Sequence, residues 1–160
     1  MGRYDAADVP EGVPLHEIRM VGVPVEIFLA ARQQHDELMR EFAVLALAHQ
    51  DQSSAAPAEL RRLVHELGAN SAAAPSRPGA EVDAAAEAGQ PTVDLVFHLP
   101  MSALRAAERF EELMQSADEF CAQGRMLTMP RSPDIRRFAE WWFRELHRQV
   151  NGEAPTPWSA

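Results

Sequence analysis

The feature that most constrains the fold is the longest helical pattern in the sequence, PVEIFLAARQQHDELMREFAVLALA, from Pro24 to Ala48. Pro24 suits a first helical position, because its missing N–H is not needed there. Apolar residues recur at steps of three and four, which places them on one face of a helix. A helix of this length spans roughly 37 Å at about 1.5 Å per residue, which is the width of a small domain. The pattern therefore predicts a central helix with the other elements packed around it.

The remaining patterns predict a helix-dominated α/β fold. A small two- or three-stranded sheet is expected from residues 15–21, 93–99 and 126–129, covered by three long helices and two short helices. The apolar run Leu95–Phe97 predicts burial of that strand on both faces. Between the second and third strands lies a helix of some twenty residues, so a right-handed crossover could connect them.

Capping residues mark the later helices. Ser102 is expected to cap a second long helix that runs to about residue 123. Ser132 with Pro133 is expected to start the last long helix, which runs to about Val150 with Phe138 and Trp142 facing inward. The short helices are expected at residues 58–68 and 80–88.

The length of 160 residues is enough for one compact domain of typical size. Residues 1–14 are expected to form a flexible N-terminal tail, and residues 15–152 a single globular domain. Residues 69–79 are expected to form a flexible internal loop, and residues 153–160 a C-terminal tail.

Charge and composition exclude several classes of function. The net charge is −9, with 15 arginines and no lysine, so no nucleic-acid partner is expected. The uncharged run Phe42–Ala48 is far too short to span a membrane, so no membrane partner is expected. The only cysteine, Cys121, excludes an internal disulfide, fits a reducing compartment and is expected to be buried and inert. The N-terminal residues lack the apolar core of a signal peptide, so a cytoplasmic location is expected.

No catalytic or cofactor motif is present, so we expect a protein that is not an enzyme, with no cofactor and no metal site. The six histidines form no HExxH, HxH or Cys/His pair. The best single polar candidate is His98, because a strand end before a helix is where ligands collect in α/β folds. His35, on the apolar face of the central helix, and Asp118 are the other candidates. These three residues are the expected lining of a pocket in the alternative function, a small-molecule or metal-binding sensor.

The C-terminal region favours a binding surface for another protein. Residues 125–148 contain six arginines beside Trp141, Trp142 and Phe143, and arginine and tryptophan are enriched at interface hot spots. The residues expected to bind the partner are Arg137, Trp141, Arg144, Arg148 and Trp158. Trp158 lies in the tail, where it could dock on the body of the protein or on a partner.

Several segments resemble a known family: VGVPVEIFLAARQQHDELMREFAVLAL, VDLVFHLP, ADEFC and MLTMPRSPDIRRFAEWWFRELHRQVNGEAPTPW. They are similar to a largely uncharacterised family of small actinobacterial proteins associated with anti-sigma-type ATPases and STAS-domain regulators. The resemblance covers residues 15–158 and carries no catalytic signature. It implies a role in partner-switching signalling.

The first hypothesis is therefore a non-catalytic cytoplasmic regulatory or adaptor protein that binds another protein, such as an anti-sigma-type ATPase or a STAS-domain protein. A homodimer is a further expectation, because surplus apolar helix faces often pair about a twofold axis.

Overall fold

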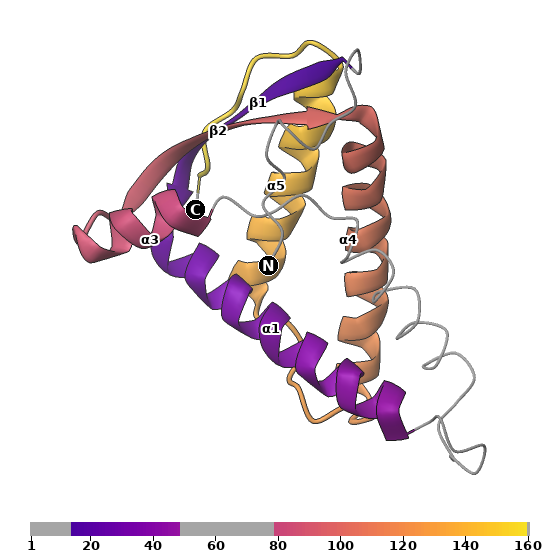
Figure 1. Ribbon diagram of the computed structural model, residues 1–160. Helices are drawn as coiled ribbons and strands as arrows, with labels where there is room; N and C mark the ends of the chain where they lie inside the picture. Colours follow the sequence, from indigo (N-terminus) through magenta and orange to yellow (C-terminus); the bar gives the residue numbers. More distant parts are fainter. Residues whose placement is uncertain (1–13, 49–78, 160) are drawn as a thin grey trace.

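The computed structural model describes residues 14–48 and 79–159 (Figure 1). In chain order its elements are β1 (Leu15–Pro24), α1 (Val25–Ala48), α3 (Gly79–Glu87), β2 (Thr92–Pro100), α4 (Met101–Ala122) and α5 (Pro133–Val150). The predicted helix-dominated α/β fold is confirmed. The predictions for residues 1–13, for a helix at 58–68 and for residues 69–78 lie outside the described residues.

The sheet consists of β1 and β2, which run antiparallel from Leu15 opposite Pro100 to Pro24 opposite Thr92. Alternation places Ile18, Met20 and Leu95 on the inner face, where all three are buried. The opposite face carries Glu17, Arg19, Val96 and His98, and these four are exposed. One face of the sheet therefore packs on the helices, and the other faces outward.

A bulge interrupts the pairing between Met20 and Val23. Gly22 lies there with φ of 69°, a backbone conformation that favours glycine. Its N–H donates to Oδ1 of Asp94 at 2.7 Å, so a side chain on β2 replaces the interrupted backbone contact.

Three long helices lie on one side of the sheet, with α5 behind the strands, α4 beside it and α1 crossing below (Figure 1). The main core lies between the sheet and these helices. Its buried members are Ile18, Met20, Val23, Val25, Phe28, Val82, Ala85, Leu95, Leu99, Ala103, Leu104, Ala107, Phe138, Trp141 and Leu146. A second core joins α1, α4 and the segment after α4, at Leu38, Phe110, Leu113, Met114, Ala117, Cys121 and Met126.

Four sequence predictions are wrong in detail. Residues 126–129 form bends rather than a strand, so no crossover from β2 is made. The N-cap of α4 is Pro100 rather than Ser102, and Pro24 ends β1 rather than starting α1. Val96 is 56% exposed, because helices cover only one face of the sheet.

The last helix buries Phe138 as predicted, but Trp141 rather than Trp142 is its more deeply buried tryptophan. Trp141 is buried at 3% exposure, whereas Trp142 is only partly buried against Phe97, with stacked rings 5.9 Å apart. Glu145 lies on the buried face beside Trp141. The predicted cap at Ser132 is confirmed, since its hydroxyl accepts a hydrogen bond from the N–H of Ile135 at 3.3 Å. Within the described ranges, no helix combines the length and apolar character that crossing a membrane requires.

Candidate functional site

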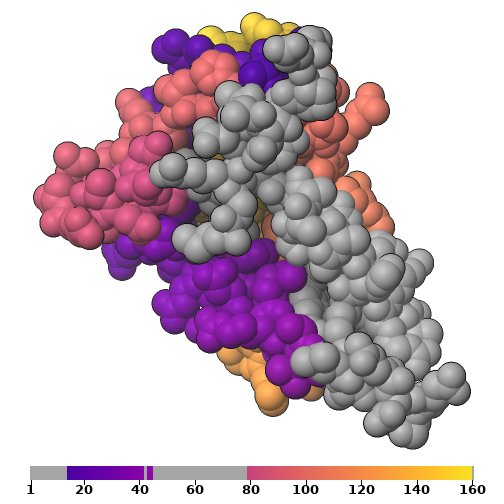
Figure 2. Space-filling view, in the orientation of Figure 1, coloured from indigo at the N-terminus to yellow at the C-terminus, as the bar shows by residue number. Residues whose placement is uncertain are grey.

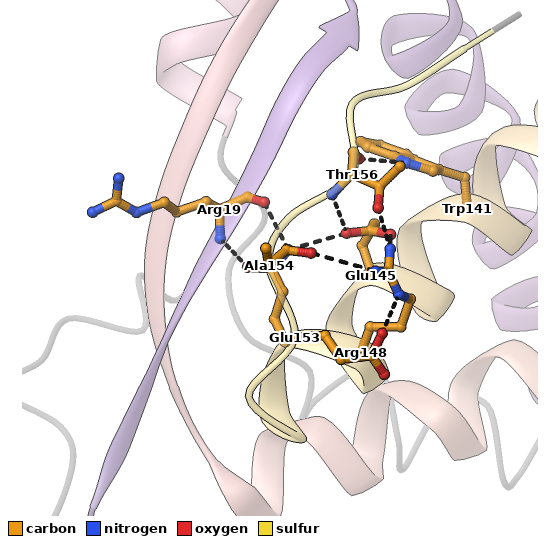
Figure 3. Close-up of polar contacts among 8 residues, drawn as sticks. Arg19, Trp141, Glu145, Arg148, Glu153, Ala154 and Thr156 are labelled. Atoms are coloured by element: carbon orange, nitrogen blue, oxygen red, sulfur yellow. Dashed lines mark hydrogen bonds and ion pairs between the residues drawn. The ribbon is translucent and has the colours of Figure 1, made fainter.

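The α5 helix places Trp141, Glu145 and Arg148 four and three residues apart, so they share one face of the helix. After Val150 the chain turns at Asn151 and Gly152 and runs back as an extended tail. That tail lies on the outside of the molecule beside β1, where Figure 2 shows yellow next to indigo. The tail residues Thr156 and Trp158 contact the α5 face. We call Trp141, Glu145, Arg148, Thr156 and Trp158 the tail cluster, and Figure 3 shows the first four of them.

Glu145 is the centre of the tail cluster and is only 1% exposed. Its carboxylate accepts hydrogen bonds from the Thr156 N–H at 2.8 Å and from Nη1 of Arg148 at 2.8 Å. A third, longer contact comes from Nε2 of Gln149 at 3.4 Å. A buried carboxylate is costly unless it is paired and hydrogen-bonded. The tail backbone therefore supplies a donor that this charge requires.

Arg148 connects the helix to three residues of the tail, Glu153, Thr156 and, through Nη2 at 3.5 Å, the carbonyl of Ala154. Its Nε lies 2.8 Å from Oε2 of Glu153, and its Nη1 also donates to the hydroxyl of Thr156. The carboxylates of Glu153 and Glu145 raise the pKa of the guanidinium above its ordinary value. The side chain thus binds one buried and one exposed carboxylate at the same time.

Aromatic contacts complete the attachment of the tail. Nε1 of Trp141 donates to the carbonyl of Thr156 at 3.1 Å. The Trp158 ring meets Trp141 edge-to-face, with centroids 5.6 Å apart, and meets Phe138 at 5.7 Å. The Trp158 N–H donates to the carbonyl of Val21 at 3.0 Å, so the tail also reaches β1.

The five residues that the sequence proposes for partner binding separate into two groups. Arg137 and Arg144 are exposed on the outer side of α5, and Arg137 pairs with Asp134 at 2.7 Å. Trp141 and Trp158 contact each other instead, and Trp141 and Arg148 both bind Thr156 of the tail. Trp141 can reach a partner only if the tail leaves. Of the two docking sites open for Trp158, the structure shows the body of the protein.

The segment 125–132, between α4 and α5, is held by a side chain of α1. Glu41 accepts hydrogen bonds from the N–H of Leu127 at 2.6 Å, from the N–H of Thr128 at 2.8 Å and from the Thr128 hydroxyl at 2.7 Å. Burial alone raises the pKa of this carboxylate, but the three hydrogen bonds outweigh burial and lower it. We call residues 125–132 the projecting loop.

Arg131 fixes the other end of the projecting loop. Its guanidinium binds Glu111 through Nη1 and Nη2 at 3.0 and 3.2 Å, and Nε binds Asp118 at 2.8 Å. The N–H of Arg131 also donates to Asp118, and Gln34 donates to the carbonyl of Met129 at 2.8 Å. Burial opposes the charge of Arg131, but Glu111 and Asp118 outweigh burial and raise its pKa.

With its backbone held in this way, the loop directs apolar side chains outward. Leu127 is 94% exposed and Met129 is 75% exposed. Between them in sequence, Thr128 points to Glu41. This site was not predicted, because residues 126–129 were expected to form a strand. The available signal was the pair of turn-forming prolines that follow, at positions 130 and 133.

The three residues of the sensor hypothesis contact different partners. The His35 ring lies 5.3 Å from Phe110 between α1 and α4. His98, on the outer face of the sheet, lies 3.5 Å from Glu17. Asp118 binds Arg131. The structure does not bring these three side chains together in one pocket.

A shallow groove of about 240 Å³ lies between α4 and α5. Its apolar floor includes Leu104 and Phe143, and its polar rim includes Arg105, Glu108 and His147. This volume is below the range of about 300–1,000 Å³ that is usual for small-molecule sites. Cys121 is buried, and desolvation with the charges of Asp118 and Glu41 raises the pKa of its thiol to about 11.

Among residues 14–48 and 79–159, no group of three or more histidine, cysteine, aspartate or glutamate side chains could hold a metal ion. The fold and the site define a helix-dominated α/β protein with a two-stranded antiparallel sheet and an apolar projecting loop. Comparison with known protein families, with curated proteins and with solved structures finds no match.

Proposed function

We propose that this protein is a non-catalytic regulatory adaptor that acts in the cytoplasm by binding another protein through the projecting loop. The observation that carries the proposal is the exposure of Leu127 and Met129 on a backbone that side chains of α1 and α4 hold in place.

Single exposed apolar residues are common on protein surfaces and need no explanation. The projecting loop differs because two large apolar side chains lie two residues apart on a hydrogen-bonded backbone. Val44 is also 65% exposed and lies on α1 three residues after Glu41, on the same side of that helix. Burying such side chains against a partner gains about 25 cal/mol for each Å² removed from water.

The hydrogen bonds to Glu41, Asp118 and Gln34 make the loop suitable as an anchor. A loop that is ordered before binding loses less conformational entropy when the complex forms. Arg125 begins the loop, and its guanidinium lies 5.4 Å from the centre of the Phe120 ring. A partner that fits this surface has an apolar pocket with an acidic rim.

The regulatory role rests on the family resemblance, which associates such chains with partner switching. An anti-sigma-type ATPase or a STAS-domain protein is therefore the class of partner to test first.

The experiment places a photo-crosslinking amino acid at position 127 of the full chain in host cells. The control places it at position 101, because Met101 is also an exposed apolar residue, at the start of α4. The crosslinked protein is identified by mass spectrometry and purified, and its affinity is measured by calorimetry. We expect the double variant Leu127→Ser, Met129→Ser to bind at least tenfold more weakly, which corresponds to about 1.4 kcal/mol.

Two variants provide the comparison in the same assay. Met101→Ser makes the same chemical change outside the loop and should leave the affinity within twofold of the wild type. The double variant Arg137→Ala, Arg144→Ala tests the outer side of α5. Loss of binding in that variant, with full binding by the loop variant, would refute the projecting loop as the site.

A further inference from the structure

The two edges of the sheet differ in whether described residues bind their backbone groups. Along the outer edge of β1, the Gln149 side chain accepts from the N–H of Arg19 and donates to its carbonyl, both at 2.8 Å. Two residues further, the Trp158 N–H binds the carbonyl of Val21. Helix α5 and the tail therefore cover this edge, which would otherwise offer unpaired backbone groups.

The direction in which the backbone groups of β2 point can be derived from the pairing with β1. In an antiparallel pair, successive residues direct their N–H and C=O groups to opposite edges. Because the backbone groups of Arg19 point away from β2, those of its neighbour across the pair, Val96, point away from β1. The same holds for Asp94 and His98, two residues to either side. No described residue makes a backbone hydrogen bond to these three, and all three are exposed.

This edge is complementary to itself. If a second copy of β2 pairs antiparallel about a twofold axis at Val96, each Val96 lies opposite the other. Asp94 of each copy then lies opposite His98 of the other, so a carboxylate faces an imidazole twice. Within one copy, Asp94 accepts from the N–H of Gly22 and His98 lies 3.5 Å from Glu17. The N–H and C=O groups of the three residues on each strand form a ladder of about six hydrogen bonds.

We propose that the outer edge of β2 is a homodimerisation site, at which two copies join their sheets into one antiparallel sheet of four strands. The occupant is a second copy rather than a foreign strand, because pairing with its own reversed sequence places a carboxylate opposite an imidazole on both sides of Val96. A two-stranded sheet is also smaller than the common size of about four to six strands. This surface is separate from the projecting loop, so the two proposals stand or fall independently.

The first test uses opposite charges at the twofold axis. Wild-type protein of 17.8 kDa per chain is measured by light scattering during size exclusion, and we expect twice that mass. Val96→Asp and Val96→Lys each place like charges opposite one another, so each should dimerise at least tenfold more weakly. An equimolar mixture of the two variants should recover the dimer. A monomeric wild type at about 100 µM, or a mixture that stays monomeric, overturns the proposal.

The second test does not depend on those variants. Paired residues of this hydrogen-bonded kind have Cα atoms about 5.5 Å apart, within the usual range of a disulfide. Val96→Cys should therefore crosslink two copies under oxidised glutathione, whereas Arg19→Cys, on the same face of the neighbouring strand, should not. Equal crosslinking of both variants, or of neither, contradicts pairing at this edge, including the case in which β2 binds a strand of another protein.

Discussion

The tail cluster and the projecting loop use the same chemistry with opposite results. Each has one arginine bound to two carboxylates: Arg148 with Glu145 and Glu153, and Arg131 with Glu111 and Asp118. In the tail cluster these bonds hold the chain so that aromatic rings are covered. In the projecting loop they hold the chain so that apolar side chains are uncovered.

The two regions differ in which of their groups find partners when the chain folds. In the tail cluster, the Trp158 ring packs on two other rings and the buried carboxylate receives its donors. In the projecting loop, the backbone, the polar side chains and Met126 find partners in the fold. Leu127 remains in water. An exposed apolar side chain on a well-held loop is therefore the better candidate for binding than a tryptophan inside the fold.

The largest effect is expected from Arg131→Ala, which leaves Glu111 and Asp118 buried without their cation. Removal of one member of a buried ion pair costs about 4 kcal/mol, which should appear as a lower unfolding free energy in urea. Arg144→Ala removes an exposed arginine and should change that energy by less than about 0.5 kcal/mol. Equal effects of the two variants would mean that the loop is not held by this pair.

Glu145→Ala tests the cost of removing one member of a buried ion pair in the tail cluster. We expect a loss of about 3 kcal/mol, less than for Arg131, because the orphaned Arg148 keeps Glu153 and reaches water. Amide exchange at Thr156 should become faster, because its N–H loses its acceptor. Glu140→Ala, exposed on the same helix, is the control and should be nearly neutral.

Trp158→Ala and Leu127→Ala compare an apolar side chain of the tail cluster with one of the projecting loop. Trp158 is partly buried, so its truncation should cost about 2 kcal/mol and shift the fluorescence of Trp141 to the red. Leu127→Ala should change stability by less than about 0.5 kcal/mol. A leucine variant as destabilised as the tryptophan variant would show that the loop side chains already pack in the free protein.

Among the variants that remove a native contact, Glu41→Gln is expected to cost the least, about 1–2 kcal/mol. Hydrogen bonds lower the pKa of Glu41 in the folded protein. Its stabilisation is therefore complete above the pKa that it has in the unfolded chain, and disappears as the pH falls through the lower folded value. Urea unfolding of wild type and variant from pH 7 to pH 3 should show a difference that shrinks on acidification. A difference that does not change with pH would contradict the role of the charge.

Local signals in the sequence predicted much of the fold. The spacing of apolar residues identified α1 and α4, and the hydroxyl of Ser132 identified the start of α5, because these depend on neighbours within a few positions. The sequence could not show that Glu145 is buried. A carboxylate on a helix is usually solvated, and this one is compensated by Thr156, eleven residues away.

The projecting loop depends on contacts that are more distant still. Glu41 and Leu127 are 86 residues apart, and no periodicity within either segment relates them. The alternation of MLTM is that of a strand, but the Glu41 carboxylate takes the two N–H groups that a strand would pair. Long-range hydrogen bonding overrode the local pattern, which is why the site emerged only from the structure.

The two prolines of the tail, Pro155 and Pro157, limit how large an assembly can grow. Neither has an N–H, so the tail can cover the β1 edge without presenting a continuous row of donors to a further strand. Among the described residues, α5 and the tail cover the β1 edge, so the proposed sheet growth by addition of chains would use the β2 side. Pairing there occupies the open side of both copies, so association ends at a closed pair and cannot polymerise into a fibre.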